Sequence, residues 1–300
     1  MMIPEILIGQ ILAIIAAITY AENSIVYSYL GKKITIRASV HVRLWIAVPI
    51  IIIMALVMEG NFFTQATASN WIILLLSGLL GYFFCDSLLF WAFTNIGPRE
   101  GMVIMTLNPI ITTLLSYLFF KEVLTVLQLF AIIITITGII ILILNHNKEY
   151  DITKKKNQIK GTIFAFLAAI FQAVSNLLAK SALSNLGPVS TNSIRMIGGL
   201  IGAVIFALFI RKEFKNDFLV FKNKKYFSLL LFATITGPVI GMSLLLTSFN
   251  YSPVGLVTAI VQISPIFILI YELIFLKKRI KSLEILGTLI SVAGVAMMFL

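Results

Sequence analysis

Apolar stretches, each about as long as a membrane-spanning helix, follow one another along the whole 300-residue chain. A helix needs about 20 apolar residues to cross a bilayer core about 30 Å thick. Hydrophobic residues make up 60% of the chain and charged residues 12%, whereas soluble proteins usually contain about 25% charged residues. The chain is therefore predicted to be an all-α polytopic membrane protein in a lipid bilayer, and a soluble enzyme is excluded.

Ten transmembrane helices are predicted, and no loop between them is long enough to fold as a soluble domain. They cover residues 6–30, 40–58, 71–94, 101–120, 126–144, 161–184, 193–211, 226–251, 254–276 and 283–300. The N-terminus lacks a basic region and a small-residue cleavage site before the first span, so we expect a retained helix and no signal peptide. Cys85 is the single cysteine, so no intrachain disulfide is expected.

The sequence repeats itself. Residues 92–122 resemble residues 248–278, and the prolines in the middle of these stretches, Pro109 and Pro265, are 156 positions apart. In the first two spans of each half the offset is 152, which places an insertion between the second and third spans. Self-similarity with a five-span period is typical of a duplicated transporter.

This repeat predicts two domains and a linker. The first five-helix repeat covers 1–145, a basic cytoplasmic linker covers 146–160, and the second five-helix repeat covers 161–300.

The basic residues predict how the two halves are oriented. Loops after the first, third, fifth, seventh and ninth spans hold 19 of the 23 Lys and Arg, and the other loops hold only Lys121. Cytoplasmic loops are rich in Lys and Arg, so the odd loops are predicted to be cytoplasmic and both termini extracytoplasmic. Equivalent loops of the two halves then face opposite sides of the plasma membrane. The net charge of +11 is interpreted as anchoring beside anionic lipid and not as nucleic-acid binding.

This pattern resembles the EamA family of the drug/metabolite transporter superfamily. Each half has an arginine early in its second span, a proline in the middle of its fourth, and a small-residue fifth span with a glycine. These residues are Arg43 and Arg195, Pro109 and Pro265, and Gly138 and Gly294. The resemblance implies a ten-helix inverted repeat with a central cavity lined mainly by spans 1–4 and 6–9. It also implies transport of amino acids or other small metabolites, often outward.

One pair of positions departs from the family. The family commonly has a Gly-Glu pair at the ends of the fourth and ninth spans, where this chain has Lys121-Glu122 and Lys277-Lys278. The departure argues against a carboxylate role shared by the two copies. Glu272, close to Lys277, is interpreted as an interfacial ion pair.

Two acids lie within predicted spans, where ionisable residues are rare and mark substrate or ion pathways. Asp86 lies in the third span and Glu22 in the first, and Met242 occupies the position equivalent to Asp86. Each acid is either a proton or substrate site or a structural partner for a base such as Arg43. Arg43 and Arg195 are expected to be anchors whose side chains reach the membrane interface, and not substrate clamps.

Other polar and aromatic residues within the spans are candidates for the lining of a substrate cavity. They are Tyr20, Asn23, Asn108, Gln172, Asn176, Gln262 and Trp91. Hydrogen bonds between helices, and packing in the case of Trp91, explain the same residues without a substrate.

Pro109 and Pro265 are hinge candidates, because proline removes a backbone hydrogen bond from a helix and frees a carbonyl one turn earlier. The alternative is a static kink. Gly97-Pro98 and Ser252-Pro253 are turns at opposite ends of the predicted cavity and are candidate gates. An ordinary tight turn is the alternative.

The expected function is secondary transport of a small molecule, with no cofactor and no metal. Histidine occurs only at positions 41 and 146, and no phosphate-binding glycine loop is present. Alternating access would be coupled to protons through Asp86 or Glu22, or uncoupled, in a monomer or homodimer. The resemblance favours export. The alternative is a multidrug or lipid-intermediate flippase, and a membrane-embedded lipid enzyme is disfavoured because the acids are not clustered.

Overall fold

The computed structural model describes residues 5–60, 66–120, 125–145, 152–182, 186–211, 214–252 and 254–297, and within these ranges the chain has helices and no strand. Seven helices in this part of the chain are long and apolar enough to cross a membrane, and two further apolar helices are shorter. The predicted class, an all-α polytopic membrane protein, is confirmed.

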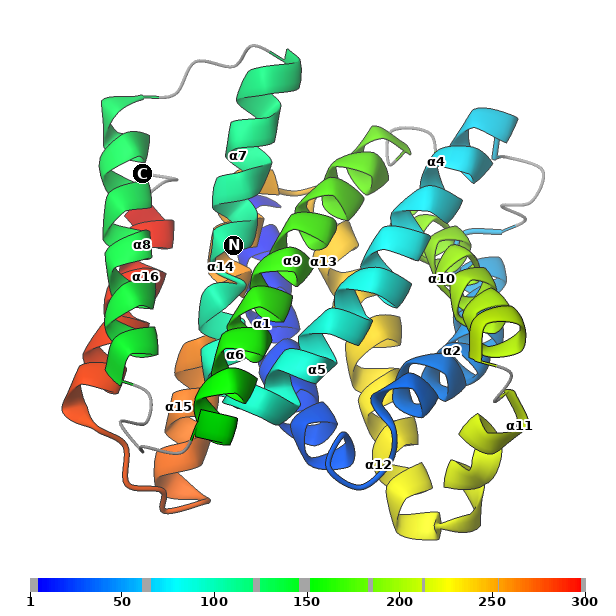
Figure 1. Ribbon diagram of the computed structural model, residues 1–300. Coiled ribbons are helices and arrows are strands. Elements are labelled where there is room, and N and C mark those ends of the chain that lie inside the picture. The colour runs from blue at the N-terminus through cyan, green and yellow to red at the C-terminus, as the bar shows by residue number, and fades with distance from the viewer. Residues whose placement is uncertain are drawn as a thin grey trace.

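The helices form one bundle, and three of the segments, η1, η2 and η4, are π-helical (Figure 1). In chain order the elements are α1 (Glu5–Leu30), α2 (Ile36–Met58), α4 (Ala68–Gly78), η1 (Leu79–Cys85), α5 (Asp86–Ile96), α6 (Pro98–Ile104), α7 (Leu107–Phe120), α8 (Val126–Asn145), α9 (Ile152–Ala182), α10 (Pro188–Ile205), η2 (Phe206–Arg211), α11 (Phe214–Asp217), the 3-10 segment η3 (Phe218–Lys222), α12 (Lys224–Thr234), η4 (Ile235–Gly241), α13 (Met242–Ser248), α14 (Val254–Val261), α15 (Ser264–Ile274) and α16 (Ser282–Met297).

Two predicted spans are broken helices. The span predicted at 101–120 consists of α6 and α7, and the span predicted at 254–276 consists of α14 and α15. In the predicted linker, the chain is helical from Ile152 onward, where the Lys and Gln residues are good helix formers. The rest of that linker, 146–151, lies outside the described residues.

Two of the π-helical segments occupy equivalent positions in the two halves. η1 and η4 begin and end 156 residues apart, which is the offset of the sequence repeat. In η4, Pro238 lacks an N–H donor, so the regular helical ladder cannot continue through it. Single π-helical turns within α-helices are frequent at functional sites.

The turns that carry the basic residues gather at one end of the bundle. In Figure 1 the turns after α1, after α5, between η3 and α12, and after α15 all lie at the lower end. At the opposite end, the carboxylate of Glu59 accepts hydrogen bonds from the backbone N–H groups of Val189 (2.9 Å) and Ser190 (2.8 Å) at the start of α10. A negative charge is favourable at a helix N-terminus, so this contact ties the first half of the chain to the second.

Helices α8 and α16 pack against each other at the side of the bundle (Figure 1). Glycines on both helices allow their backbones to approach closely. A methyl group on Gly138 would overlap the backbone of Ser291, and one on Gly294 would overlap Thr135. Small residues serve this purpose in membrane helix pairs, where van der Waals packing replaces the hydrophobic effect as the driving force.

We expect Gly138→Leu to lower the thermal unfolding temperature in detergent, because the larger side chain has no space between α8 and α16. Overpacking of this kind costs about 1–3 kcal/mol. Ile140→Leu, on the exposed face of α8, is the matched control and should unfold at the temperature of the unaltered protein. Equal unfolding temperatures for both variants would contradict the close packing of these helices.

Candidate functional site

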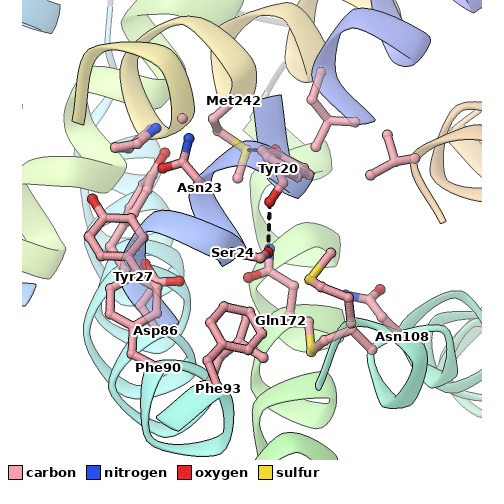
Figure 2. Close-up of a pocket in the computed structure, with 18 of the residues that line it drawn as sticks. Tyr20, Asn23, Ser24, Tyr27, Asp86, Phe90, Phe93, Asn108, Gln172 and Met242 are labelled. Atoms are coloured by element: carbon pink, nitrogen blue, oxygen red, sulfur yellow. Dashed lines mark hydrogen bonds between the residues drawn. The ribbon is translucent and has the colours of Figure 1, made fainter. Parts of the chain in front are cut away.

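A central pocket lies between the two halves of the chain. Its volume is about 140 Å³, and it is lined from α1, α2, η1, α5, α6, α7, α9, η4, α13 and α14. Figure 2 shows the side chains pointing into the pocket from opposite walls. Seven of the predicted candidates line it: Tyr20, Asn23, Asp86, Asn108, Gln172, Asn176 and Gln262.

A buried ion pair lies on one wall of the pocket. The guanidinium of Arg43 on α2 pairs with the carboxylate of Asp86, the first residue of α5. Arg43 also lies over the rings of Phe90 and Tyr27, with its Cζ atom 5.0 Å and 5.5 Å from their centroids. An arginine close to a ring face gains a cation–π attraction that is larger away from water. The alternative in which Asp86 pairs with Arg43 is thus the arrangement present in the structure.

The prediction that Arg43 and Arg195 reach the membrane interface was wrong. Arg43 is 3% exposed and Arg195 1% exposed. Arg195 donates from Nε to Ser77 Oγ (3.0 Å) and from Nη2 to Ser175 Oγ (3.1 Å). Both guanidinium groups therefore find their partners inside the bundle and do not extend along the helix to the headgroups.

The two equivalent π-helical segments are joined through one residue of α10. The hydroxyl of Tyr82 in η1 donates to Asn192 Oδ1. The amide nitrogen of Asn192 donates to the carbonyl of Pro238 in η4 (3.0 Å) and to Ser243 Oγ (3.1 Å). Asn192 is fully buried. Sequence reasoning missed it, although it lies in a polar run, VSTNSIR, that is unusual in so apolar a chain.

Aromatic rings from α1 and α5 form another part of the wall. Tyr27 and Phe90 stack with their centroids 4.0 Å apart, and Phe90 and Phe93 are 6.2 Å apart. Asp86, Phe90 and Phe93 lie on one face of α5, since residues four and seven positions apart are nearly aligned on a helix.

The candidate Trp91 is not in this pocket. It lies on the other side of α5, is 42% exposed, and packs edge-on against Phe164 of α9 with ring centroids 5.4 Å apart. One residue corresponds to about 100° of helix rotation, so Phe90 and Trp91 cannot face the same cavity.

Glu22 is also absent from the pocket lining. Its Oε2 atom accepts hydrogen bonds from Thr236 Oγ1 (2.6 Å) and Asn23 Nδ2 (2.9 Å). Thr236 belongs to η4, so this contact connects α1 with the π-helical segment of the second half. Asn23 is the neighbour that does line the pocket.

Both broken helices are interrupted at the pocket, so residues at the two interruptions line it. Met105, between α6 and α7, and Gln262, between α14 and α15, both line it. Pro109 is the third residue of α7 and Pro265 the second residue of α15. Proline is tolerated in the first turn of a helix, where the missing N–H has no partner to lose. The prolines thus begin the second helix of each broken pair, and do not kink a continuous one.

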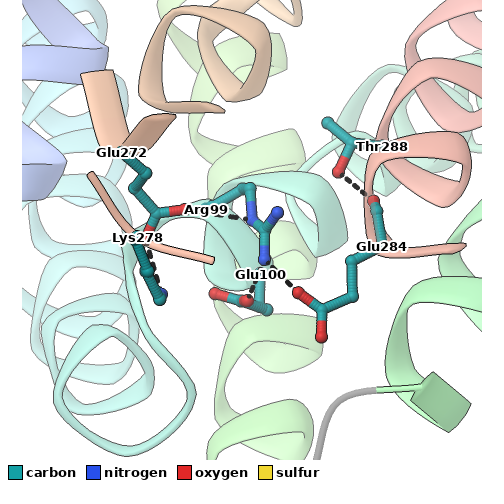
Figure 3. Close-up of polar contacts among 6 residues, drawn as sticks. All are labelled: Arg99, Glu100, Glu272, Lys278, Glu284 and Thr288. Carbon is teal, nitrogen blue, oxygen red and sulfur yellow. Dashed lines mark hydrogen bonds and ion pairs between the residues drawn. The ribbon is translucent and has the colours of Figure 1, made fainter. Parts of the chain in front are cut away.

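An ion cluster lies at the end of the bundle where the basic turns gather (Figure 3). Arg99 is 0% exposed, and its Nη2 contacts Glu100 Oε1 at 2.8 Å and Glu284 Oε2 at 2.7 Å. Its Nε lies 3.3 Å from Glu272 Oε2, and Glu272 Oε1 pairs with Lys278 Nζ at 2.9 Å. The cluster joins α6 of the first half to α15 and α16 of the second.

The candidate gate turn Gly97-Pro98 leads directly into this cluster. Gly97 has φ +96° and a side chain there would meet the Glu100 carboxylate, which explains the requirement for glycine. Pro98 is the first residue of α6. The other candidate, Pro253, lies outside the described residues. The partner expected for Glu272 was Lys277, whereas the structure pairs it with Lys278.

Membrane-length helices around a polar central pocket are the form expected of a membrane transporter. The family model of the EamA-like transporter family matches residues 7–144 and 159–300. The chain belongs to this family, within the drug/metabolite transporter superfamily.

Two further comparisons agree with this assignment. The uncharacterized transporter YyaM of Bacillus subtilis (strain 168) is 26% identical over 173 residues, 57% of this chain and 55% of YyaM, so the match spans about half of that relative. A protein solved by crystallography aligns over 96% of this chain and 95% of its own, with a TM-score of 0.67 and 14% identity. At that identity the likeness concerns the fold alone.

We expect Asp86→Asn and Arg43→Gln each to destabilise the protein, because each leaves its partner as an unpaired buried charge. Breaking such a pair costs about 3 kcal/mol or more. The double variant should lose clearly less stability than the sum of the two single variants. The measurement is a double-mutant cycle on thermal unfolding in detergent, and additive losses would contradict a direct interaction between these side chains.

Proposed function

We propose that this protein is a secondary transporter of small organic metabolites, with amino acids as the preferred class, and that it works by alternating access. Two inverted five-helix halves, 1–145 and 161–300, would move about the central pocket. The observation that carries the proposal is that equivalent elements of both halves, the π-helical segments and the broken helices, meet at this pocket. Discontinuous helices at the interface of inverted repeats form the substrate sites of many transporters.

The chemistry of the pocket supports an amino acid as substrate. It offers a base and an acid, Arg43 and Asp86, beside the aromatic rings of α1 and α5. Four buried polar atoms of its lining have no hydrogen-bond partner among the described residues: Arg43 Nε, Asn23 Oδ1, Tyr27 Oη and Gln262 Oε1. Buried polar groups are nearly always paired, so a polar ligand would complete them. A carboxylate suits the Arg43 side, and an ammonium group suits the amide oxygens and ring faces.

The packing supports a conformation closed at the end with the ion cluster. There α5 and α6 both pack against α1. At the other end, the equivalent helix pairs, α9 with α13 and α9 with α14, form no extended contact among the described residues. We propose that the Arg99 cluster holds the closed end shut and that the Gly97-Pro98 turn moves when it opens. Breaks before Pro109 and Pro265 would serve as the hinges.

The orientation in the cell follows from the basic turns. We propose that the end carrying the ion cluster is cytoplasmic, that both termini are extracytoplasmic, and that the protein resides in the plasma membrane. The closed end is then the cytoplasmic one, and the described conformation is outward-facing. Export is the proposed direction, with a monomer or homodimer as the working unit.

Uptake and counterflow in proteoliposomes test the substrate class, with each of the twenty amino acids and with or without an imposed pH gradient. We expect saturable exchange of one or a few amino acids. Asp86→Asn should reduce it at least about tenfold, since a charge-assisted contact to a ligand contributes about 1.5–3 kcal/mol. Ser87→Ala, the neighbouring residue outside the pocket lining, is the matched control. Loss of the gradient dependence in Asp86→Asn or Glu22→Gln would identify the proton site.

Folded protein that exchanges none of the twenty amino acids would refute the proposed substrate class. The same vesicles would then be loaded with cationic drugs and lipid-linked substrates, which the alternative transport function predicts.

The Arg99 cluster has its own test. In a Cys85→Ser background, Met102→Cys places a thiol in the pocket lining. Arg99→Gln should speed maleimide labelling of this thiol from the cationic side, because it removes every contact between Arg99 and the three carboxylates. A shift of about 1.4 kcal/mol in the conformational equilibrium corresponds to about tenfold in labelling rate. Lys215→Gln, an exposed base at the same end, is the control. Unchanged labelling in Arg99→Gln would refute the proposed role of the cluster.

A further inference from the structure

A second cavity, larger than the central pocket, lies on the opposite side of α5. Its volume is about 630 Å³. Its floor is formed by η1 and α5, and its walls by α9 on one side and by α10, η2 and α2 on the other. The two cavities share no lining residue. We call the second cavity the α5 groove.

The α5 groove is lined mostly by aromatic and aliphatic side chains. Phe84 of η1 stacks on Phe171 of α9 with centroids 5.4 Å apart, and Trp91 packs edge-on against Phe164 at the same distance. Phe84 and Trp91 are about two-fifths exposed. These half-exposed aromatic rings lie on helices that are long and apolar enough to cross a membrane, where apolar surface at the outside of the bundle would face the hydrocarbon of the bilayer.

The ionisable residues that line the groove lie at one end. Arg37, His41 and Asp217 line that end, with His41 and Asp217 paired to each other at 2.8 Å. On the opposite wall, Lys160 lies one helical turn before Phe164 on α9 and is exposed. Residues four apart share a helix face, so Lys160 lies on the face of α9 that carries Phe164. Helix α9 begins at the lower end of the bundle in Figure 1, as α2 does, so Lys160 and Arg37 lie toward the same end. This end belongs to the side of the bundle where the basic turns gather.

The length of the groove matches one leaflet. From Lys160, one turn before the first lining residue Phe164, to Phe171 the helix α9 rises about 16 Å at 1.5 Å per residue, which is about half of a hydrocarbon core about 30 Å thick. A partner helix that crosses the membrane would need a face about twice as long. An acyl chain with a negatively charged headgroup at the basic end fits both the length and the charge.

We propose that the α5 groove is a binding site for an anionic phospholipid of the leaflet on the cationic side of the protein. One acyl chain lies among Phe84, Trp91 and Phe171, and the headgroup phosphate is held by Lys160 and Arg37. The site is independent of the transported substrate. Since α5 carries Asp86 on its opposite face, a lipid in the groove supports the helix that presents the acid to the central pocket.

Fluorescence quenching tests the site, with Trp91 as the reporter. Trp45→Phe and Trp71→Phe leave Trp91 as the single tryptophan of the three. The protein is placed in phosphatidylcholine bilayers with increasing fractions of brominated phosphatidylglycerol or, separately, brominated phosphatidylcholine. Each basic residue near the surface favours an anionic lipid by about fivefold. Half-maximal quenching should therefore need at least about fivefold less of the brominated phosphatidylglycerol.

Variants distinguish the groove from the general lipid environment. Lys160→Ala should reduce the preference for phosphatidylglycerol by about fivefold, whereas Lys224→Ala, an exposed base at the same end, should leave it unchanged. Ala207→Phe fills the groove wall and should reduce quenching by both lipids. Native mass spectrometry of the protein with all its tryptophans should find retained phosphatidylglycerol, which Lys160→Ala loses.

Equal quenching by the two brominated lipids would overturn the proposal. A native mass spectrum that shows a dimer without retained lipid, and in which Ala207→Phe yields monomer, would also overturn it. In that case a second copy of the chain covers the groove.

Discussion

The ion pair between Arg43 and Asp86 is the interaction on which the central pocket depends. Away from water a buried charge is costly, so an ionised acid within the bundle needs a base or hydrogen-bond donors as partners. Arg43 supplies it from α2, and this contact fixes how α2 and α5 sit around the cavity. The rings of Tyr27 and Phe90 enclose the guanidinium. The pocket is therefore polar at its centre without carrying a net charge from this pair.

Part of this site was predictable from the sequence because polar residues within apolar spans are easily recognised. Polar residues are few in so apolar a chain, so Asp86, Asn108 and Gln262 stood out and do line the pocket. The direction of the Arg43 and Arg195 side chains was not predictable, because an arginine near the end of a span either extends to the headgroups or turns into the bundle. The choice depends on partners such as Ser77 and Ser175, which are distant in the chain.

The helix starts were also only partly predictable from the sequence, because they depend on contacts outside the apolar stretch. The second span was predicted to begin at residue 40, but α2 begins at Ile36, because the Thr35 side chain accepts a hydrogen bond from the N–H of Ala38 at 3.2 Å. Such a capping contact extends a helix beyond its apolar residues. The π-helical segments gave no sequence signal at η1, whereas Pro238 marks η4. Asn192, which joins these two segments, is a short polar residue whose importance appears only when its neighbours are known.

A π-helical segment and a broken helix occur in both halves of the chain, but the charges at the equivalent turns differ. Arg99 and Glu100 correspond in the second half to Gly255 and Leu256, so the first half has a charged cluster at its helical turn and the second half has apolar residues at the equivalent place. A symmetric pair of halves would populate the two facing states equally. In the proposed mechanism, the ion pairs of Arg99 hold one end closed, so the populations of the two states would differ before any solute arrives. A solute can reverse that difference only if it binds the less populated state more tightly by at least the same free energy.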